Sequence, residues 1–295
     1  MHNKTENARF GKASIAPYIF LAPIAIFTAF FFILPLSSSV YLSFTRWNGL
    51  SAPRWIGADN YTFLFTQSPE FWDTLVNTLI VAGSLVIIGV PVSVLLAAVF
   101  ARSRGRAIWR SVLLLPQITN VVAIGYIWQF VLDDNNGLVN RSLAGFGVRG
   151  PDWFSDPTWA MISVIMVMIW YEAGKNMLIL SAAIDGVSPS LTEAAQLDGA
   201  GPIRIFWSIT LPLIRPALTF VVITSFLTGM GWFALILAMT GGDPRGATNV
   251  TALFVYNMAF EDLRMGRASA GAMILFVLVA LVSMLQFRAM RGRAA

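Results

Sequence analysis

The side chains most able to do chemistry in this sequence are polar residues within one long apolar run, Tyr171, Glu172, Lys175 and Asn176. If that run crosses a membrane, a charge near its centre costs about 2.5–3.5 kcal/mol even on the mildest insertion scale, and such groups usually face a cavity or a partner. Glu172 and Lys175 are three residues apart and can neutralise each other on one helical face. The pair therefore either fixes helix packing or lies beside a polar path.

Two helical stripes within the apolar runs carry polar, aromatic or small residues. The first is predicted from its residues to line a solute path, whereas for the second that role is implied only by the family resemblance described below. The first, in the run 158–183, consists of Met168, Tyr171, Glu172 and Lys175. The second, in the run 217–240, consists of Ser225, Thr228, Gly229 and Trp232, and a further candidate is Gln117, next to Pro116. An aromatic ring beside polar groups suits a sugar, which offers an apolar face and many hydroxyl groups. Helix packing is the competing interpretation, because small residues let membrane helices approach closely.

The composition excludes several kinds of chemistry and indicates a polytopic membrane protein. Of the 295 residues, 57% are hydrophobic and 12% charged, whereas a soluble domain carries about 25% charged residues. There is no cysteine, and the single histidine, His2, lies in a polar tail, so we expect no metal site and no histidine-based catalysis. No GxxxxGK(S/T) pattern occurs, and we expect the chain to bind no cofactor of its own.

Six apolar runs predict six membrane-spanning helices after a polar cytoplasmic tail, residues 1–14, with residues 15–295 as a single transmembrane domain. The runs cover residues 15–41, 74–100, 108–132, 158–183, 217–240 and 268–287. Prolines are expected to end or kink the first span at Pro17, Pro23 and Pro35 and to kink the third at Pro116. The loop 42–72 carries aromatic residues that suit a membrane–water interface, namely Trp47, Trp55, Tyr61, Phe71 and Trp72.

The distribution of charge orients these spans. Segments on the side of the two termini hold twelve Lys and Arg residues and four acidic residues. The opposite loops hold seven Lys and Arg residues and ten acidic residues. Lys and Arg favour the cytoplasmic side, which predicts that both termini and the segment 188–216 are cytoplasmic. The basic pI of about 9.9 then reflects membrane topology and not nucleic-acid binding.

The segment 188–216 is the only long polar segment on that inner side. Pro189 and Pro202 suit first helical positions, and the glycines between them are expected to end the first helix. Ser190 and Glu193 have the spacing of a capping box. The sequence therefore predicts a helix, a glycine turn and a second helix that lie across the ends of two spans.

This segment resembles the cytoplasmic coupling loop of bacterial binding-protein-dependent ABC transporter permeases. The family pattern is Glu-Ala-Ala, three residues, Gly, nine residues, Ile, one residue and Leu-Pro. Every spacing is met by Glu193-Ala194-Ala195, Gly199, Ile209 and Leu211-Pro212. Asp198-Gly199-Ala200 further resembles the sugar-importer branch. The first-span segment, the short outer loops and the stretch Gly137-Leu138-Val139-Asn140 resemble the maltose-type first permease of that branch. The resemblance extends from about Leu21 to Phe287.

The resemblance implies a fold, a role and a set of partners. The fold would be all-α, a polytopic membrane protein with six transmembrane helices of the type I ABC importer permease, N-in and C-in, in the inner membrane of a bacterial cell. The chain would be a permease subunit and not an enzyme, with ATP and Mg²⁺ bound by two separate ATPase subunits. Its other partners would be a second homologous permease, an extracytoplasmic solute-binding protein and membrane lipid. The residues implied to couple transport to the ATPase are Glu193, Ala194, Ala195, Asp198 and Gly199.

Three alternatives stay open at this point. Glycerol phosphate or another small polar solute would fit the same outline, and Lys175 leaves an anionic solute open. A polytopic membrane enzyme would need a cluster of His, Asp or Glu near one membrane face, which the scattered outer acids do not supply. A secondary transporter could use Glu172 and Lys175 for ion coupling, but that role gives no reason for the segment 188–216.

Overall fold

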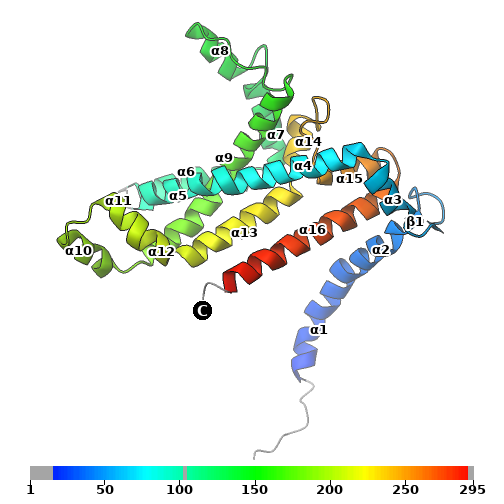
Figure 1. Cartoon of the computed structure of the whole chain (residues 1–295), viewed down its shortest axis with the longest axis horizontal. Coiled ribbons are helices and arrows are strands. Elements are labelled where there is room, and N and C mark those ends of the chain that lie inside the picture. The colour runs from blue at the N-terminus through cyan, green and yellow to red at the C-terminus, as the bar shows by residue number, and fades with distance from the viewer. Residues whose placement is uncertain (1–15, 102–104, 292–295) are drawn as a thin grey trace, which may run out of the picture.

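The computed structural model describes residues 16–101 and 105–291, which form a bundle of helices with one short pair of strands (Figure 1). The strands β1 (Thr45–Arg46) and β2 (Arg54–Trp55) pair antiparallel. The predicted cytoplasmic tail, residues 1–14, lies outside the described residues.

The helices follow the order of the predicted spans. The first span consists of α1 (Ala16–Thr28), the π-helical segment η1 (Ala29–Ile33) and α2 (Leu34–Ser43). Next come α3 (Asp59–Thr66), α4 (Pro69–Ser84), the π-helical segment η2 (Leu85–Gly89) and α5 (Val90–Ala101). They are followed by α6 (Arg106–Ile118), α7 (Val121–Val131), α8 (Leu138–Gly145) and α9 (Pro157–Asp185). The last elements are α10 (Pro189–Leu197), α11 (Pro202–Ile205), the π-helical segment η3 (Phe206–Thr210), α12 (Leu211–Leu213), α13 (Arg215–Gly231), α14 (Ala234–Met239), α15 (Thr251–Phe260) and α16 (Met265–Arg291).

Four of the described helices are long and apolar enough to cross a membrane, Ile19–Ser43, Pro69–Phe100, Pro157–Asp185 and Met265–Arg288. Two bent pairs bring the number to the predicted six when each pair is counted as one span. The prolines do not end the first span, because the helix continues through Pro23 and past Pro35, which follows η1. Local π-helical adjustments satisfy the backbone groups that proline frees in a membrane helix.

The third span bends later than the expected position at Pro116. The helices α6 and α7 meet at 99°, and the break lies at Thr119 and Asn120, which both have extended backbone. The Asn120 side chain accepts hydrogen bonds from the backbone N–H groups of Val122 (2.9 Å) and Ala123 (3.3 Å). This N-cap begins a new helix, so the third span consists of two helices at nearly a right angle.

The fifth span is not the continuous helix predicted over 217–240. The helix α13 ends at Gly231, and α14 begins after Trp232 and Phe233, whose backbones leave the helical region. Glycine is a poor helix former, which weakens the helix at this end. At its other end α13 meets the segment 202–213 at a 74° bend, and the two together make up the fifth candidate span.

Two glycines let helices of the bundle touch backbone to backbone. A Cβ added at Gly174 in α9 would overlap the carbonyl oxygen of Leu113 in α6, and a Cβ added at Gly229 in α13 would lie 2.5 Å from the Cα of Ala82 in α4. The helix α9 is central, because α5, α6 and α13 all pack against it. The main apolar cluster joins α4, α7, α9, α14 and α15 through the buried residues Val81, Ile124, Val167, Leu235 and Leu253.

The predicted outer loops contain structure of their own. The loops 42–72, 133–157 and 241–267 include α3, α8 and α15, respectively. Trp55 and Trp72 are exposed, as residues of a membrane-interface belt would be, but Phe71 is fully buried. The expectation for Phe71 is therefore wrong, because it packs in an apolar cluster with residues of α3, α15 and α16.

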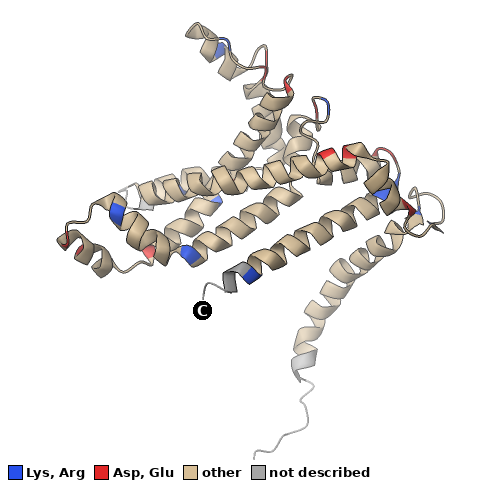
Figure 2. Ribbon diagram, viewed as in Figure 1, with Lys and Arg blue, Asp and Glu red and all other residues tan. Residues whose placement is uncertain are grey.

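The two ends of the bundle differ in structure. The helix α10 and the C-terminal end of α16 lie at one end, whereas β1 and α3 lie at the other (Figure 1). Lys and Arg mark α11 and the nearby ends of α13 and α16 on the α10 side, and others lie beside α3 and β1 at the opposite end (Figure 2). The helix α10 thus lies on the side of the C-terminal end of α16, as the predicted topology requires.

Candidate functional site

The segment 188–216 is predicted to be cytoplasmic, and we call it the cytoplasmic unit. Its part 202–213 also belongs to one of the two bent pairs that qualify as candidate spans by length and composition. The unit begins with α10 at Pro189, as predicted, but the predicted capping box is wrong. Ser188 is the N-cap residue, and Ser190 lies within the first turn, where its hydroxyl is 2.8 Å from the Ser188 hydroxyl. Glu193 is exposed and forms no hydrogen bond or ion pair among the described residues. Its carboxylate therefore has no capping role and stays accessible to a partner.

Gly199 ends α10 in the left-handed conformation, with φ +78°. The Ala200 N–H donates to the Ala195 carbonyl at 2.9 Å, and the Gly199 N–H donates to the Gln196 carbonyl at 3.0 Å. These two bonds form a Schellman motif. A Cβ at Gly199 would meet nothing within 4 Å, so the position requires glycine for its backbone angle and not for space.

The cytoplasmic unit exposes most of its surface. No residue of α10 is buried, and Leu197 is 90% exposed. Of the other predicted coupling residues, Ala194 and Asp198 are exposed, while Ala195 is half-buried. The unit leaves the bundle after α9 and returns to it at α13 (Figure 1). The exposed carboxylates of Glu193 and Asp198 and the exposed side chain of Leu197 are therefore all accessible to a partner.

Inside the bundle, Glu172 and Lys175 form an ion pair, as their spacing predicts. The Glu172 side chain is 5% exposed and the Lys175 side chain 37% exposed, so the carboxylate lies in the interior and the lysine at its edge. Asn176 Nδ2 donates to the Ser225 hydroxyl at 3.1 Å and thereby ties α9 to α13. The helical stripes do not include Asn176, although its position four residues after Glu172 puts it on the same face.

The structure divides the predicted path residues into two groups. The residues buried within the chain are Met168, Glu172, Ser225 and Gly229. Those that stay partly exposed are Gln117, Tyr171, Lys175, Thr228 and Trp232. Packing accounts for much of the first group, since Met168 belongs to the main apolar cluster and Gly229 touches α4. The partly exposed group, which we call the polar edge, is the better candidate for contact with a solute.

The polar edge brings three helical segments together. Tyr171 and Trp232 meet edge to face, with ring centroids 5.3 Å apart. Gln117 Nε2 donates to the Tyr171 carbonyl at 2.8 Å, which brings α6 to the same place. Trp232 Nε1 and Asn176 Oδ1 are buried and have no hydrogen-bond partner among the described residues. A buried polar atom without a partner calls for an explanation, and a visiting polar solute is one.

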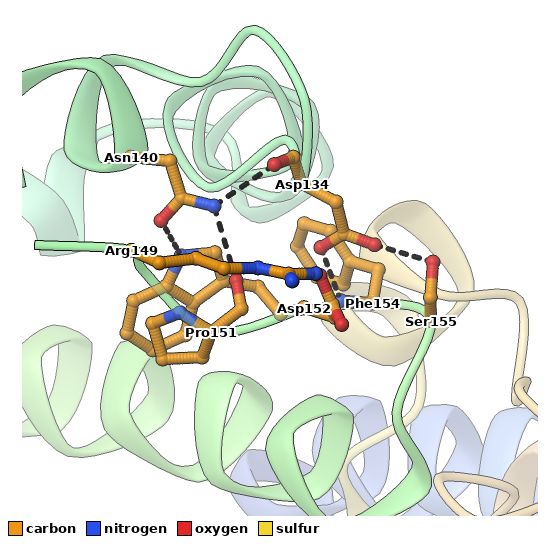
Figure 3. A network of polar contacts seen from close by, with 8 residues as sticks. Asp134, Asn140, Arg149, Pro151, Asp152, Phe154 and Ser155 are labelled. Atoms are coloured by element: carbon orange, nitrogen blue, oxygen red, sulfur yellow. Dashed lines mark hydrogen bonds and ion pairs between the residues drawn. The ribbon is translucent and has the colours of Figure 1, made fainter. Parts of the chain in front are cut away.

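A second structured region is α8, which projects away from the rest of the bundle, whereas α7 packs against α14 (Figure 1). Asn140 in α8 is the centre of a polar network (Figure 3). Its Nδ2 donates to the carbonyls of Asp134 (2.9 Å) and Pro151 (3.0 Å), and its Oδ1 accepts from Trp153 Nε1 at 2.8 Å. The Asp134 carboxylate accepts from the Phe154 N–H at 2.9 Å. These bonds fix α8 to the segment that leads into α9.

A bundle with up to six candidate spans, an exposed helical unit between α9 and α13 and polar side chains among its apolar helices are together typical of a membrane transport subunit. The chain belongs to the family described as binding-protein-dependent transport system inner membrane component, whose model matches residues 89–292. The resemblance found in the sequence is thereby confirmed, and with it the inner-membrane location. Family membership decides against the membrane-enzyme and secondary-transporter alternatives.

Relatives of the same kind match nearly the whole chain. The chain is 32% identical over 286 residues to the probable ABC transporter permease protein YesP of Bacillus subtilis, covering 94% of this chain and 91% of the relative. It is 32% identical over 283 residues to the sulfoquinovosyl glycerol transport system permease protein SmoG of Agrobacterium fabrum, covering 93% and 90%. The fold matches a chain of a crystal structure of a bacterial ABC transporter involved in the import of the acidic polysaccharide alginate, with a TM-score of 0.81, 25% identity, and coverage of 94% and 95%. The predicted all-α permease fold is confirmed.

Proposed function

We propose that this chain is one of two permease subunits of an ATP-driven importer for a sugar or related carbohydrate. The observation that carries this proposal is the continuity of α9. The middle of α9 bears Tyr171, Glu172 and Lys175, and its cytoplasmic end is separated from α10 by only three residues. A displacement of α10 would therefore reach the polar edge through a nearly unbroken helical path, as rigid-body switching requires.

The remaining parts of the importer would be separate chains. A second, homologous permease would complete the pathway, and an extracytoplasmic solute-binding protein would deliver the solute. Two ATPase subunits would bind ATP and Mg²⁺, so that this chain itself would bind no cofactor. The cytoplasmic unit would dock in a cleft of one ATPase subunit, with Glu193 and Asp198 as charged contacts and Ala194 and Ala195 as small surfaces for close approach. Gly199 would make the turn that lets both helices of the unit reach the cleft.

The solute would bind where α9 meets the end of α13. Tyr171 and Trp232 offer aromatic surface, and the unpaired Trp232 Nε1 offers a donor. The last turn of α13 ends at Gly231, and a helix C-terminus leaves carbonyl groups without an intrahelical partner. Broken membrane helices bind polar groups at such ends. A neutral carbohydrate, with hydroxyl groups that donate and accept, supplies partners for all of these.

An anionic carbohydrate is the second candidate, because the Lys175 side chain is partly exposed. The structural neighbour named above takes part in the import of an acidic polysaccharide. In this chain, however, Glu172 already neutralises Lys175. An anion would have to displace a nearly buried carboxylate, whereas a neutral solute needs no such exchange, so the neutral carbohydrate is favoured.

Purification of the tagged full chain with its native partners tests the proposal. We expect a P-loop ATPase and a second permease to co-purify, and the reconstituted complex to take up a neutral oligosaccharide only with ATP and the solute-binding protein. Uptake of a uronic oligosaccharide in place of the neutral one would favour the second candidate. Uptake driven by an ion gradient without any ATPase would contradict both.

A further inference from the structure

A pocket of about 650 Å³ lies at the outer end of the bundle, away from the polar edge. It is formed by the loop that carries β1 and β2 and by the first turn of α16. Four arginines line it, and the only acidic residue in its lining is Asp59; the arginines are Arg46, Arg54, Arg264 and Arg267. The pocket is therefore strongly positive.

The arginines are arranged as if for an anion that is not part of this chain. Arg46 and Arg54 stand directly opposite each other in the β1–β2 pair, where like charges repel. Among the described residues neither forms an ion pair, and Arg264 has only Asp262 at 3.9 Å. Arg267 stacks over the Phe63 ring at 3.6 Å, which holds its guanidinium in place. A phosphate group accepts paired hydrogen bonds from guanidinium groups and would relieve this repulsion.

The pocket also lies at a defined depth in the membrane. The candidate span Ile19–Ser43 ends just before Arg46, and the span Met265–Arg288 begins at its lining. The two spans are tied together there, because the Gly266 N–H in α16 donates to the Trp47 carbonyl at 3.1 Å and α2 packs along α16. Asn60 in α3 fixes the end of the first span, since its Nδ2 donates to the carbonyls of Ser43 (2.9 Å) and Thr45 (2.8 Å). A pocket at the outer ends of two spans lies at the level of the lipid headgroups.

Three aromatic side chains lie near the pocket but do not line it. Trp55 follows Arg54 in β2 and therefore points to the other face of the β1–β2 pair, where it stacks on Phe44 with ring centroids 5.5 Å apart and lies 6.0 Å from Tyr41. Tyr and Trp are enriched at headgroup level in membrane proteins, so this aromatic group supports the depth assigned to the pocket. Leu36 and Val40 in α2, nearer the middle of the span, have exposed side chains. A ligand with a charged head at the pocket and apolar chains along α2 fits this arrangement.

We propose that this pocket binds the phosphate headgroup of an anionic phospholipid in the outer leaflet of the inner membrane. Arg46 and Arg54 hold the phosphate between them, Arg264 and Arg267 complete the positive wall, and the acyl chains lie along α2. An acidic patch of the solute-binding protein could meet the same charges, but the headgroup depth and the apolar surface below the pocket favour a lipid. The proposal does not depend on which solute is carried.

The test compares two double variants of the full chain, purified with its co-purifying subunits. In R46Q/R54Q the pocket loses two charges, while R141Q/R149Q removes two outer arginines that do not line it. Bound phosphatidylglycerol is counted by native mass spectrometry, with phosphatidylcholine of the same acyl chains as reference. We expect phosphatidylglycerol retention to fall about tenfold in R46Q/R54Q, because charge-assisted contacts are lost, and to stay at the wild-type level in R141Q/R149Q. R46K/R54K keeps the charge without the paired geometry and should retain an intermediate amount.

Three results would overturn the proposal. Equal retention in the wild type and R46Q/R54Q would show that the pocket holds no lipid. If inorganic phosphate raises the melting temperature of the wild type as much as phosphatidylglycerol does, the pocket binds a free anion and not a lipid. Equal retention together with a weakened affinity of R46Q/R54Q for the solute-binding protein would assign it to protein docking. The melting temperature of each variant without added lipid shows whether folding itself has changed.

Discussion

Two glutamates, Glu172 in α9 and Glu193 in α10, have carboxylates with opposite surroundings. Glu172 is 4% exposed and paired with Lys175, in a place where a buried charge without a partner would be strongly destabilising. Glu193 is exposed and has no ion-pair partner among the described residues. One carboxylate is thus used within the chain, and the other is available to a different chain.

Two glycines repeat this contrast. Gly174 is required for space, because a Cβ there would overlap the Leu113 carbonyl, whereas Gly199 has open space around it and is required for its φ of +78°. A substitution at Gly174 should therefore damage the bundle itself, and a substitution at Gly199 should damage only the shape that the chain presents to a partner. Some residues thus hold the bundle together, and others are presented to a partner subunit. Each of the following predictions tests one of these two roles.

The largest effect is expected from Glu193→Lys and Gly199→Val. Reversing an interfacial charge costs about 2–5 kcal/mol, so ATP-driven uptake should fall more than tenfold while the amount of chain in the membrane stays normal. Gly201→Val is the matched control, because Gly201 has extended backbone and nothing within 4 Å of an added Cβ. The measurement is solute-stimulated ATPase activity in reconstituted complexes, and normal stimulation and uptake in both variants would falsify the coupling role.

Gly174→Ala should reduce assembly, where the coupling variants do not. Overpacking a tight contact costs about 1–3 kcal/mol, and destabilisation of about 1–2 kcal/mol lowers cellular abundance several-fold. Gly231→Ala makes the same chemical change at a glycine with no atom within 4 Å of the added Cβ, and its abundance should match the wild type. Quantitative blotting of membranes measures the abundance of each variant. Equal abundance of the two variants would show that the helices move apart at no cost.

Tyr171→Ala and Trp232→Ala test the polar edge as a solute surface. The pair is worth about 0.5–1.5 kcal/mol beyond its buried area, and we expect uptake to fall about fivefold with basal ATPase activity unchanged. Tyr126→Ala removes an aromatic ring that is 59% exposed on α7 and should leave uptake intact. If uptake survives the loss of both rings at the polar edge, the solute contacts the partner permease instead.

The smallest quantity to be measured is the coupling energy of the ion pair. Lys175→Gln leaves the buried Glu172 carboxylate unpaired, whereas Glu172→Gln leaves a lysine that already reaches the surface, so Lys175→Gln should be the more destabilising change. The double variant should recover part of the loss, of the order of 1 kcal/mol, in a double-mutant cycle of thermal denaturation. A double variant less stable than either single variant would show that the two side chains do not interact.

The sequence predicts the coarse architecture well, because hydropathy and the Lys and Arg distribution act over whole spans. It also predicts the turn at Gly199, since a left-handed residue after a short helix strongly selects glycine. It fails at the breaks near Asn120 and Trp232, where the run of apolar residues continues while the backbone turns. A hydropathy window sums composition and does not register the backbone angles of single residues.

The candidate site was only partly predictable for a related reason. Helical periodicity places Met168, Tyr171 and Glu172 on one face, but it does not tell which of them neighbouring helices cover. In the structure α4 covers Gly229 and the main apolar cluster covers Met168, which leaves Tyr171 at the edge. The Ser188 cap likewise depends on where the chain leaves α9, and the Ser190–Glu193 spacing alone could not show this.

The tight joints at Gly174 and Gly229 also determine where a conduit can open. Backbone against backbone leaves no room for water between α6 and α9 at the first joint, or between α4 and α13 at the second. A channel through the middle of this chain would have to separate both pairs of helices. Tyr171, Lys175 and Trp232 are not covered by either joint, so we expect the conduit to form along the flank of the chain, with a second subunit as its opposite wall.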